Sequence, residues 1–465
     1  MTRARAFVAF IAAAWLALAP PSPASAAEVL PRRMAFGVTV EPHQGGGLIV
    51  RSVVERLTAD AAGVQAGDVI LSVDGADTDA PEDLLRIAAE KRSGDRLRLS
   101  VRRGGEHRLL DAVARERPVE HYDRATVTLG AAPFQGGLLR SLFVRPDGWR
   151  DGPVVFLLQG HPCVTVEAPD SRDPAHALIQ NLADRGLAVY RIEKRGVGDS
   201  RGGSSCESGD FDVEVATFAA GWRDLTQERD IAPGRVFLFG HSMGGSVAPL
   251  IAAGQAENPP GGVIVYGTLA RNVRDYLFDL LRLQDFLMTG ADPVESNRLA
   301  EANRVSLDQV ILGQDSLATI AGRDPGARDL LSQHLQWDGA DGILGHDVSF
   351  WRTLARQDLI AAWRDTRSPV LSLYGASDFT ALNDEDAVLI ADIVNHYRPG
   401  TARMEEIANA DHLMSGAPGR EQARGSPDAN GPMLGLSPPR PLHPQIPKLV
   451  GDWIMALEAL AVPES

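Results

Sequence analysis

One stretch decides the fold of this chain: residues 236–245, with the sequence Val-Phe-Leu-Phe-Gly-His-Ser-Met-Gly-Gly. It opens with an apolar run short enough for a buried strand, and the small and apolar residues after it, up to Ala253, suit a helix. Between the two lies Gly-x-Ser-x-Gly, centred on Ser242. Glycines flank a serine in this way where it lies on a sharp strand-to-helix turn, because side chains beside it would collide with neighbouring backbone. The stretch predicts an exposed Ser242 hydroxyl and, at the helix start, a Met243 N–H that is free to donate to an oxyanion.

From this stretch onward the chain resembles the α/β-hydrolase superfamily of serine hydrolases. The resemblance implies an α/β fold with a mostly parallel sheet over residues 121–462. Short, mainly apolar segments such as residues 154–158 and 263–266 are typical of strands buried on both faces of such a sheet. Helical patterns interrupt the alternation at about residues 269–366, where the superfamily carries a cap over its site. One of these patterns predicts a helix over about 350–363. A glycine-rich turn in another kind of α/β protein is the alternative for the motif alone.

The resemblance also indicates which carboxylate accompanies the serine. A serine hydroxyl is a poor nucleophile and needs a histidine base that is itself oriented by a carboxylate. The superfamily's chain order is serine, acid, histidine. Asp378 lies in the loop just beyond the predicted strand 369–375, which is where the resemblance places the acid. Asp384 and Asp386 are the nearest rivals, and a turn-capping role is the alternative for Asp378.

His412 is the expected base, because it follows the last predicted strand, as the superfamily's histidine does. A surface-loop histidine is the alternative reading. His241 is adjacent to the serine in sequence and should point away from it. His346 and His396 lie in the predicted cap and in a predicted helix.

A second oxyanion donor should come from the loop after the strand 154–158. The match to the superfamily's His-Gly-x turn puts Gly160 at the glycine and the His161 N–H at the donor. This chain has Gln159 where histidine is usual, and Pro162 has no N–H to donate.

These residues imply acyl transfer by Ser242, His412 and Asp378 on a small-molecule ester or thioester. A peptidase is the alternative within hydrolases, and a binding protein with an inactive hydrolase fold is the alternative from another class. The sequence has no metal-ligand cluster, phosphate loop or dinucleotide fingerprint, so we expect no cofactor and no metal.

Residues 28–117 form a separate, β-rich unit that resembles a bacterial PDZ domain. The most specific part of the resemblance is Ala-Gly-x-x-x-Gly-Asp-x-Ile-Leu-x-Val-Asp-Gly over residues 62–75. In such a domain the loop containing Phe36, Gly37 and Val38 would bind the carboxylate of a peptide C-terminus, and the next strand would pair with the peptide. A spacer or dimerisation module that binds no peptide is the alternative.

The first residues resemble a secretory signal peptide, residues 1–26. Arg3 and Arg5 precede an apolar run that ends near Ala19, and an Ala-x-Ala site predicts cleavage after Ala26. The run is shorter than the roughly 20 residues of a membrane-spanning helix, so we expect no stable membrane anchor. The protein should be periplasmic or secreted.

The chain has two cysteines, Cys163 and Cys206. In an oxidising compartment an isolated pair is most simply one disulfide, and two buried thiols are the alternative. The hydrolase resemblance makes the disulfide plausible, because it places the two cysteines after neighbouring strands.

The formal net charge of −15 argues against nucleic acid or an anionic membrane surface as a partner, since both need a basic face.

Overall fold

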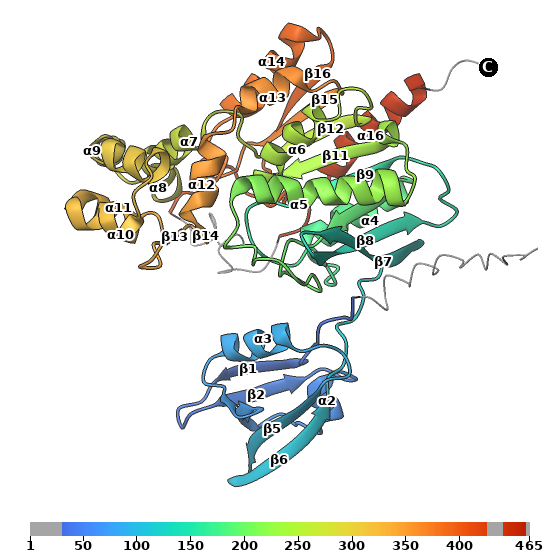
Figure 1. The fold of residues 1–465 in the computed structure, drawn as a ribbon, viewed down its shortest axis with the longest axis vertical. Helices are drawn as coiled ribbons and strands as arrows, with labels where there is room; N and C mark the ends of the chain where they lie inside the picture. The colour runs from blue at the N-terminus through green and yellow to red at the C-terminus, as the bar shows by residue number, and fades with distance from the viewer. Residues whose placement is uncertain (1–29, 426–439, 462–465) are drawn as a thin grey trace, which may run out of the picture.

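The computed structural model describes residues 30–425 and 440–461. The chain forms a small body rich in strands and a larger body in which helices cover both faces of a sheet (Figure 1). The predicted signal peptide, with its cleavage site after Ala26, lies outside the described residues. In the described ranges, no helix combines the length and the apolar character needed to cross a membrane.

The small domain is built on an antiparallel sheet in which β1, β2, β3, β5 and β6 are neighbours in that order and β4 pairs with β3. Its elements are β1 (Val38–Pro42), β2 (Leu48–Val53), α2 (Thr58–Ala61), β3 (Val69–Val73), β4 (Ala76–Asp77), α3 (Pro81–Glu90), β5 (Arg96–Arg103) and β6 (Glu106–Val113). Leu48, Ile70 and Leu99 are fully buried in a core of its own. Because β1 lies at an edge of the sheet, one side of its backbone faces no other strand of this domain.

The large domain contains an eight-stranded sheet with the order β16-β15-β12-β11-β9-β10-β8-β7. Its strands are β7 (Ala125–Phe134), β8 (Gly137–Pro146), β9 (Val154–Leu158), β10 (Ala188–Ile192), β11 (Val236–His241), β12 (Gly262–Tyr266), β15 (Val370–Gly375) and β16 (Ala402–Ile407). β8 pairs antiparallel with β7 and β10, and the other neighbours are parallel. The predicted fold class, a mostly parallel α/β sheet behind a small β-rich domain, is confirmed.

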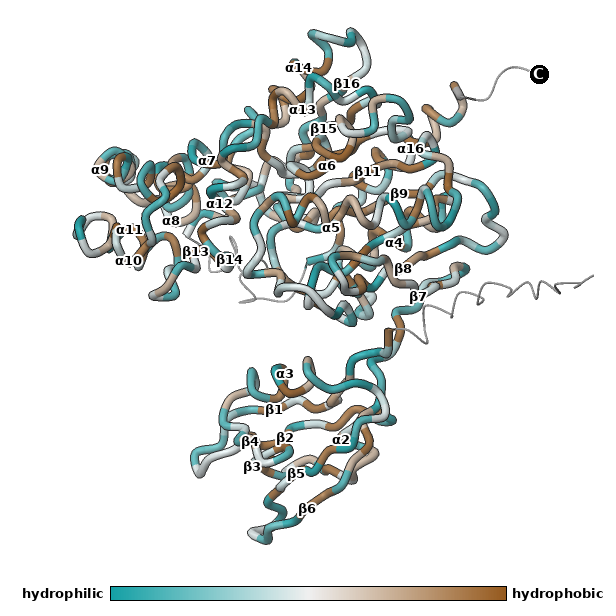
Figure 2. The backbone as a smooth tube through the Cα atoms, viewed as in Figure 1, coloured by the Kyte–Doolittle hydropathy of each residue, from teal (hydrophilic) through white to brown (hydrophobic). Residues whose placement is uncertain are grey.

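Two hydrophobic clusters cover the two faces of this sheet. One contains apolar side chains of α5 (Phe211–Arg223), α6 (Met243–Ala253) and α14 (Glu385–Tyr397), and the other those of α4 (Pro174–Asp184) and α16 (Gln445–Ala461). Figure 2 shows β11 and the following α6 largely in the brown of hydrophobic residues. The strand that carries the Gly-x-Ser-x-Gly turn is therefore at the centre of the core.

The chain between β12 and β15 is mainly helical, where a cap was expected. It contains α7 (Val273–Asp279), α8 (Asp285–Thr289), α9 (Pro293–Leu312), α10 (Leu317–Arg323), α11 (Pro325–Gln333), β13 (Gly342–Ile343), β14 (His346–Asp347), α12 (Val348–Ala355) and α13 (Leu359–Asp365). The single helix predicted over 350–363 is wrong: α12 ends at Ala355, and Asp358 caps a new helix by accepting from the Ala361 N–H.

The sheet order places the functional loops. Strand β10 pairs with one edge of β9 and strand β11 with its other edge, so the direction in which strands are added to the sheet reverses between β9 and β11. In open α/β sheets, ligands bind beyond the carboxyl ends of the strands at such a reversal. The segments that follow these two strands are Gln159–Cys163 and Ser242–Gly245.

Candidate active site

Ser242 lies on a strained turn between β11 and α6. Its φ of 53° is in the left-handed region, which side-chain-bearing residues seldom adopt. A Cβ on Gly240 would lie 2.5 Å from the Gly244 carbonyl oxygen, and one on Gly244 would lie 2.1 Å from the Leu158 carbonyl oxygen. Both glycines are therefore required for the turn, for the reason that the sequence suggested. Met243 is the first residue of α6, so its N–H is among those with no acceptor within the helix.

Asp378 and His412 meet beside this turn. Asp378 follows β15 and His412 follows β16, and the His412 Nδ1 and Asp378 Oδ2 atoms are 2.7 Å apart. Both side chains are buried, Asp378 completely. The other carboxylate oxygen of Asp378 accepts from the backbone N–H groups of Thr380 and Ala381 at 2.6 and 2.9 Å. The carboxylate is thus fixed on one side by backbone and presents its other oxygen to the imidazole.

The rival acids have other environments. The Asp386 carboxylate accepts from the Ala270 and Arg271 N–H groups, both at 2.9 Å, and from the Arg271 guanidinium. Asp384 is the N-cap residue of α14. Of the three candidate carboxylates, Asp378 is the one paired with His412.

Charge and burial separate His412 from its neighbouring histidines. Burial alone would lower the pKa of His412, but the charge of Asp378 and its hydrogen bond outweigh burial and raise it above its usual value. Burial lowers the pKa of His241 to about 4, and burial together with nearby His346 and Lys194 lowers that of His161 to about 3. His241 is neutral at physiological pH, and its Nε2–H donates to the His412 carbonyl at 2.7 Å.

A cavity of about 570 Å³ opens beside Ser242 and His412. Ser242 and His412 line it together with Gly160, His161 and Met243. The helical segment between β12 and β15 contributes apolar lining side chains, namely Tyr276, Leu277, Leu280, Met288, Leu344 and Trp351. The cavity therefore has a serine hydroxyl, a paired imidazole and an apolar wall suited to a substrate with a hydrophobic part.

The loop after β9 lies directly against the serine. A Cβ on Gly160 would be 3.0 Å from the Ser242 Cβ and 3.6 Å from its Oγ. The loop is also linked to the helical segment, because the His346 Nε2 atom lies 3.1 Å from the His161 carbonyl oxygen. The backbone at Gly160 thus lies close to Ser242, and the donor role of the His161 N–H stays a prediction.

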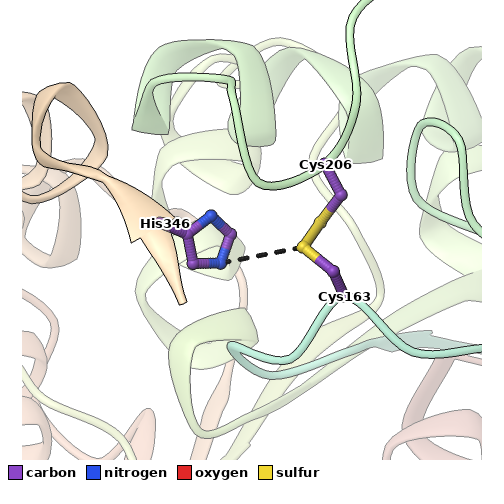
Figure 3. Close-up of side chains that lie close together, drawn as sticks. All are labelled: Cys163, Cys206 and His346. Atoms are coloured by element: carbon purple, nitrogen blue, oxygen red, sulfur yellow. Dashed lines mark hydrogen bonds between the residues drawn. A yellow bond between two sulfur atoms is a disulfide. The ribbon is translucent and has the colours of Figure 1, made fainter. Parts of the chain in front are cut away.

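A disulfide joins this loop to the segment before α5. Cys163 and Cys206 are bonded, with their Cα atoms 5.8 Å apart and a sequence separation of 43 positions. Figure 3 shows the His346 ring directed at this bond, with its Nε2 atom 3.9 Å from the Cys163 Sγ. The three residues could form a metal-ligand group only with both thiols free, and here the sulfurs are bonded to each other.

In the small domain, the predicted carboxylate-binding loop leads into the edge strand. Phe36 is buried in the domain core, and Val38 is the first residue of β1. Gly37 has a φ of 79°, and a Cβ there would lie 2.5 Å from the Leu57 Cβ. Gly37 is therefore required both by its backbone conformation and by the close approach of Leu57.

Several groups of buried charges were missed from the sequence, and two of them bear on the candidate site and on the junction of the domains. Lys194 and Glu214 pair at 2.6 Å, with side chains that are 0% and 3% exposed. At the junction of the domains, Arg32 contacts the carboxylates of Glu167 and Asp199, and all three side chains are buried. The Lys-Arg-Gly sequence after β10 is typical of an exposed loop and gives no sign that Lys194 turns inward.

The junction group ties both ends of the small domain to the large one. The Arg32 guanidinium also donates to the carbonyl oxygens of Arg117 at 2.9 Å and Pro118 at 3.1 Å, just beyond the last strand of the small domain. Arg140, on β8, binds the same Asp199 carboxylate at 3.0 Å. One buried side chain thus holds the segments before and after the small domain against the large one.

Comparison with known protein families finds a match in each of the two domains. Residues 171–393 match a family model described as serine aminopeptidase, S33, and residues 35–113 match a model of the PDZ domain.

Two curated relatives are magnetosome formation proteases MamE. The protein from Paramagnetospirillum magneticum is 33% identical over 145 residues, which cover 31% of this chain and 18% of that protein. The protein from Magnetospirillum gryphiswaldense is 35% identical over 80 residues, which cover 17% of this chain and 10% of that protein. This chain therefore spans less than a fifth of either relative.

Among solved structures, Est1E from Butyrivibrio proteoclasticus is 14% identical, with a TM-score of 0.42, and the match covers 71% of this chain and 99% of Est1E. VinJ is 18% identical with the same TM-score and the same coverage.

Proposed function

We propose that this chain, an α/β hydrolase with an N-terminal PDZ domain, is an exported serine hydrolase that cleaves a carboxylic ester or thioester. One observation carries the proposal: His412, which pairs with Asp378 at 2.7 Å, lines the same cavity as Ser242, which lies on a strained turn. The cavity's apolar lining favours an acyl or alcohol group of hydrophobic character.

In the proposed reaction the Ser242 Oγ attacks the substrate carbonyl carbon while His412 takes the hydroxyl proton. The backbone N–H groups of Met243 and His161 bind the oxyanion of the tetrahedral intermediate. When the intermediate collapses, the leaving alcohol or thiol receives the proton from His412, and an acyl group remains on Ser242. Water then attacks the acyl-enzyme with His412 as base, which releases the acid and restores the serine. Asp378 holds the imidazole in the required tautomer and stabilises its charged form.

The test is hydrolysis of p-nitrophenyl acetate and butyrate by the purified protein and its Ser242→Ala variant. We expect the variant to lose at least about 10³-fold in kcat/KM, because the nucleophile is removed. Ser332→Ala, on the exposed surface of α11, is the matched control and should retain wild-type activity. Equal rates in the wild type and Ser242→Ala would refute the proposal.

A peptidase is the second candidate. The family model is described as a serine aminopeptidase, the PDZ domain is a peptide-binding fold, and the partial curated relatives are named as proteases. In this reading, the loop at Phe36, Gly37 and Val38 captures a peptide C-terminus. Ser242-dependent cleavage of peptides with a free C-terminus, faster than of amidated ones, would favour it over the esterase. An inactive binding protein would show ligand binding without any Ser242-dependent turnover.

We assign residues 28–117 to the PDZ domain, 121–462 to the hydrolase domain and about 269–366 to a cap. Export by the signal peptide fits the disulfide between Cys163 and Cys206, since such bonds persist in oxidising compartments. N-terminal sequencing of the protein from the periplasm or medium should find Ala27 first.

A further inference from the structure

Lys194 is the second residue after β10, and its side chain is fully buried. Its Nζ atom lies 2.6 Å from the Glu214 Oε1, 2.7 Å from the Gly160 carbonyl oxygen and 3.2 Å from the His161 carbonyl oxygen. An ammonium group has three N–H donors, so each can be matched to one of these acceptors. The bond to Glu214 neutralises the ammonium charge, and the bonds to the Gly160 and His161 carbonyls hold the loop beside Ser242.

The bond to Gly160 acts on one particular peptide group. The carbonyl of Gly160 and the N–H of His161 belong to the same planar trans peptide, so they point in opposite directions. A cation bound to that carbonyl fixes the plane of the peptide and, by polarising it, makes its N–H a stronger donor. This N–H is the second oxyanion donor of the proposed mechanism, and Gly160 packs against Ser242.

A buried ion pair on its own gives no reason for this arrangement. Taking two charges out of water costs free energy, and apolar residues of similar size stabilise a core as well or better. Other features hold the loop without contacting the carbonyl of that peptide: the Cys163 disulfide lies further along the loop, and His346 contacts the His161 carbonyl. Among these contacts, the bond from Lys194 is the one made to the Gly160–His161 peptide itself.

We propose that Lys194 is a positioning residue of the oxyanion hole, which aims and polarises the His161 N–H through the Gly160 carbonyl, with Glu214 as its counter-ion. The proposal rests on the proposed function. It places the contribution of Lys194 in the transition state, because the oxyanion exists only there.

The test compares Lys194→Met with Lys194→Met/Glu214→Leu on p-nitrophenyl butyrate. The single variant leaves Glu214 as an unpaired buried charge and should unfold at a lower temperature than the wild type. The double variant removes both charges, so its melting temperature should recover towards that of the wild type. In both variants we expect kcat to fall about 10- to 100-fold, less than on full removal of an oxyanion donor, with KM changed by less than about 3-fold.

A phenylboronic acid inhibitor provides the second measurement, because it forms a tetrahedral adduct with the catalytic serine. Its affinity should fall by about the same factor as kcat. Lys448→Met is the matched control: Lys448 pairs with Asp452 on the exposed surface of α16 at 2.6 Å, and the variant should have wild-type kinetics.

A double variant with wild-type kcat, or a loss confined to KM, would overturn the role of Lys194 and leave the proposed function standing. Absence of Ser242-dependent hydrolysis in the wild type would overturn both.

Discussion

The PDZ domain and the hydrolase domain expose their sheets differently. In the PDZ domain, edge strand β1 offers main-chain groups along one side, and the loop before it depends on Gly37. In the hydrolase domain the proposed catalytic groups are side chains from loops at the ends of separate strands: Ser242 after β11, Asp378 after β15 and His412 after β16. Main-chain recognition tolerates many side chains but needs particular backbone conformations, whereas a catalytic site fails when one side chain changes.

The largest expected effect is the loss of kcat/KM on changing a side chain of the proposed catalytic site. Asp378→Asn should reduce kcat/KM by about 10⁴-fold, because an amide cannot stabilise the charged imidazole and favours the wrong tautomer. Steady-state hydrolysis of p-nitrophenyl butyrate measures this. Asp384→Asn, a change of the nearby rival acid, should leave the rate within a factor of two. A larger loss in Asp384→Asn than in Asp378→Asn would show that the acid is assigned wrongly.

The junction between the domains comes next. Arg32→Met leaves Glu167 and Asp199 buried with fewer partners, and should lower the free energy of unfolding by about 3–5 kcal/mol. Urea denaturation followed by tryptophan fluorescence measures the change. The control is Arg172→Met, because Arg172 pairs with Asp170 at the surface with its side chain 84% exposed, and such pairs contribute about 0–1 kcal/mol. Equal effects would mean that the junction is not a buried ionic contact in solution.

A main-chain position in the PDZ domain should give a smaller effect. Gly37→Ala adds a Cβ in contact with Leu57, and should destabilise that domain by about 1–3 kcal/mol through overpacking in addition to its backbone strain. Gly63→Ala is the matched control: its φ is 76° but nothing lies within 4 Å of the added Cβ, so it reports strain alone, roughly 1 kcal/mol.

Thermal unfolding separates these two variants, and both should hydrolyse p-nitrophenyl acetate at the wild-type rate. A loss of hydrolysis in Gly37→Ala would contradict the separation of the two domains' roles, since it would show that the catalytic site depends on the backbone of the PDZ domain.

The smallest effect is a displacement of the pH profile. His412 must be neutral to accept the serine proton, and its raised pKa keeps it protonated to higher pH than an ordinary histidine. The kcat/KM should therefore fall as pH decreases through a value above about 6.5, the ordinary pKa of histidine. His241 and His161, with pKa values of about 4 and 3, stay neutral over this range. His396→Gln should leave the profile unchanged, and a midpoint below pH 6 would contradict the assignment of the base.

The sequence predicted much of the fold because its signals are local. A strand, a Gly-x-Ser-x-Gly turn and a helix are adjacent in the chain, and the motif order indicated which carboxylate and imidazole to seek. The structure brings Asp378 and His412 together and lines one cavity with His412 and Ser242, while their chemical roles stay predictions.

The buried charges could not be predicted in this way. Lys194 and Glu214 are 20 positions apart, and Arg32 and Glu167 are separated by 135 residues. A lysine or arginine in a loop is usually exposed, and only the packing of distant segments turns these inward. The break between α12 and α13 was missed because the apolar pattern continues across it, whereas the Asp358 side chain starts a new helix.

The contacts of Arg32 also bear on how this protein can be rebuilt. The Arg32 guanidinium donates to the Arg117 carbonyl, and the Arg117 N–H donates to the Arg33 carbonyl at 2.9 Å. The small domain therefore begins and ends at the same place beside the hydrolase domain. Domains with adjoining ends are the ones that tolerate exchange and permutation. The PDZ domain should therefore be replaceable. Another domain whose two ends lie equally close together could be inserted between Arg33 and Arg117, and the buried ion pairs of Arg32 with Glu167 and Asp199 would be kept.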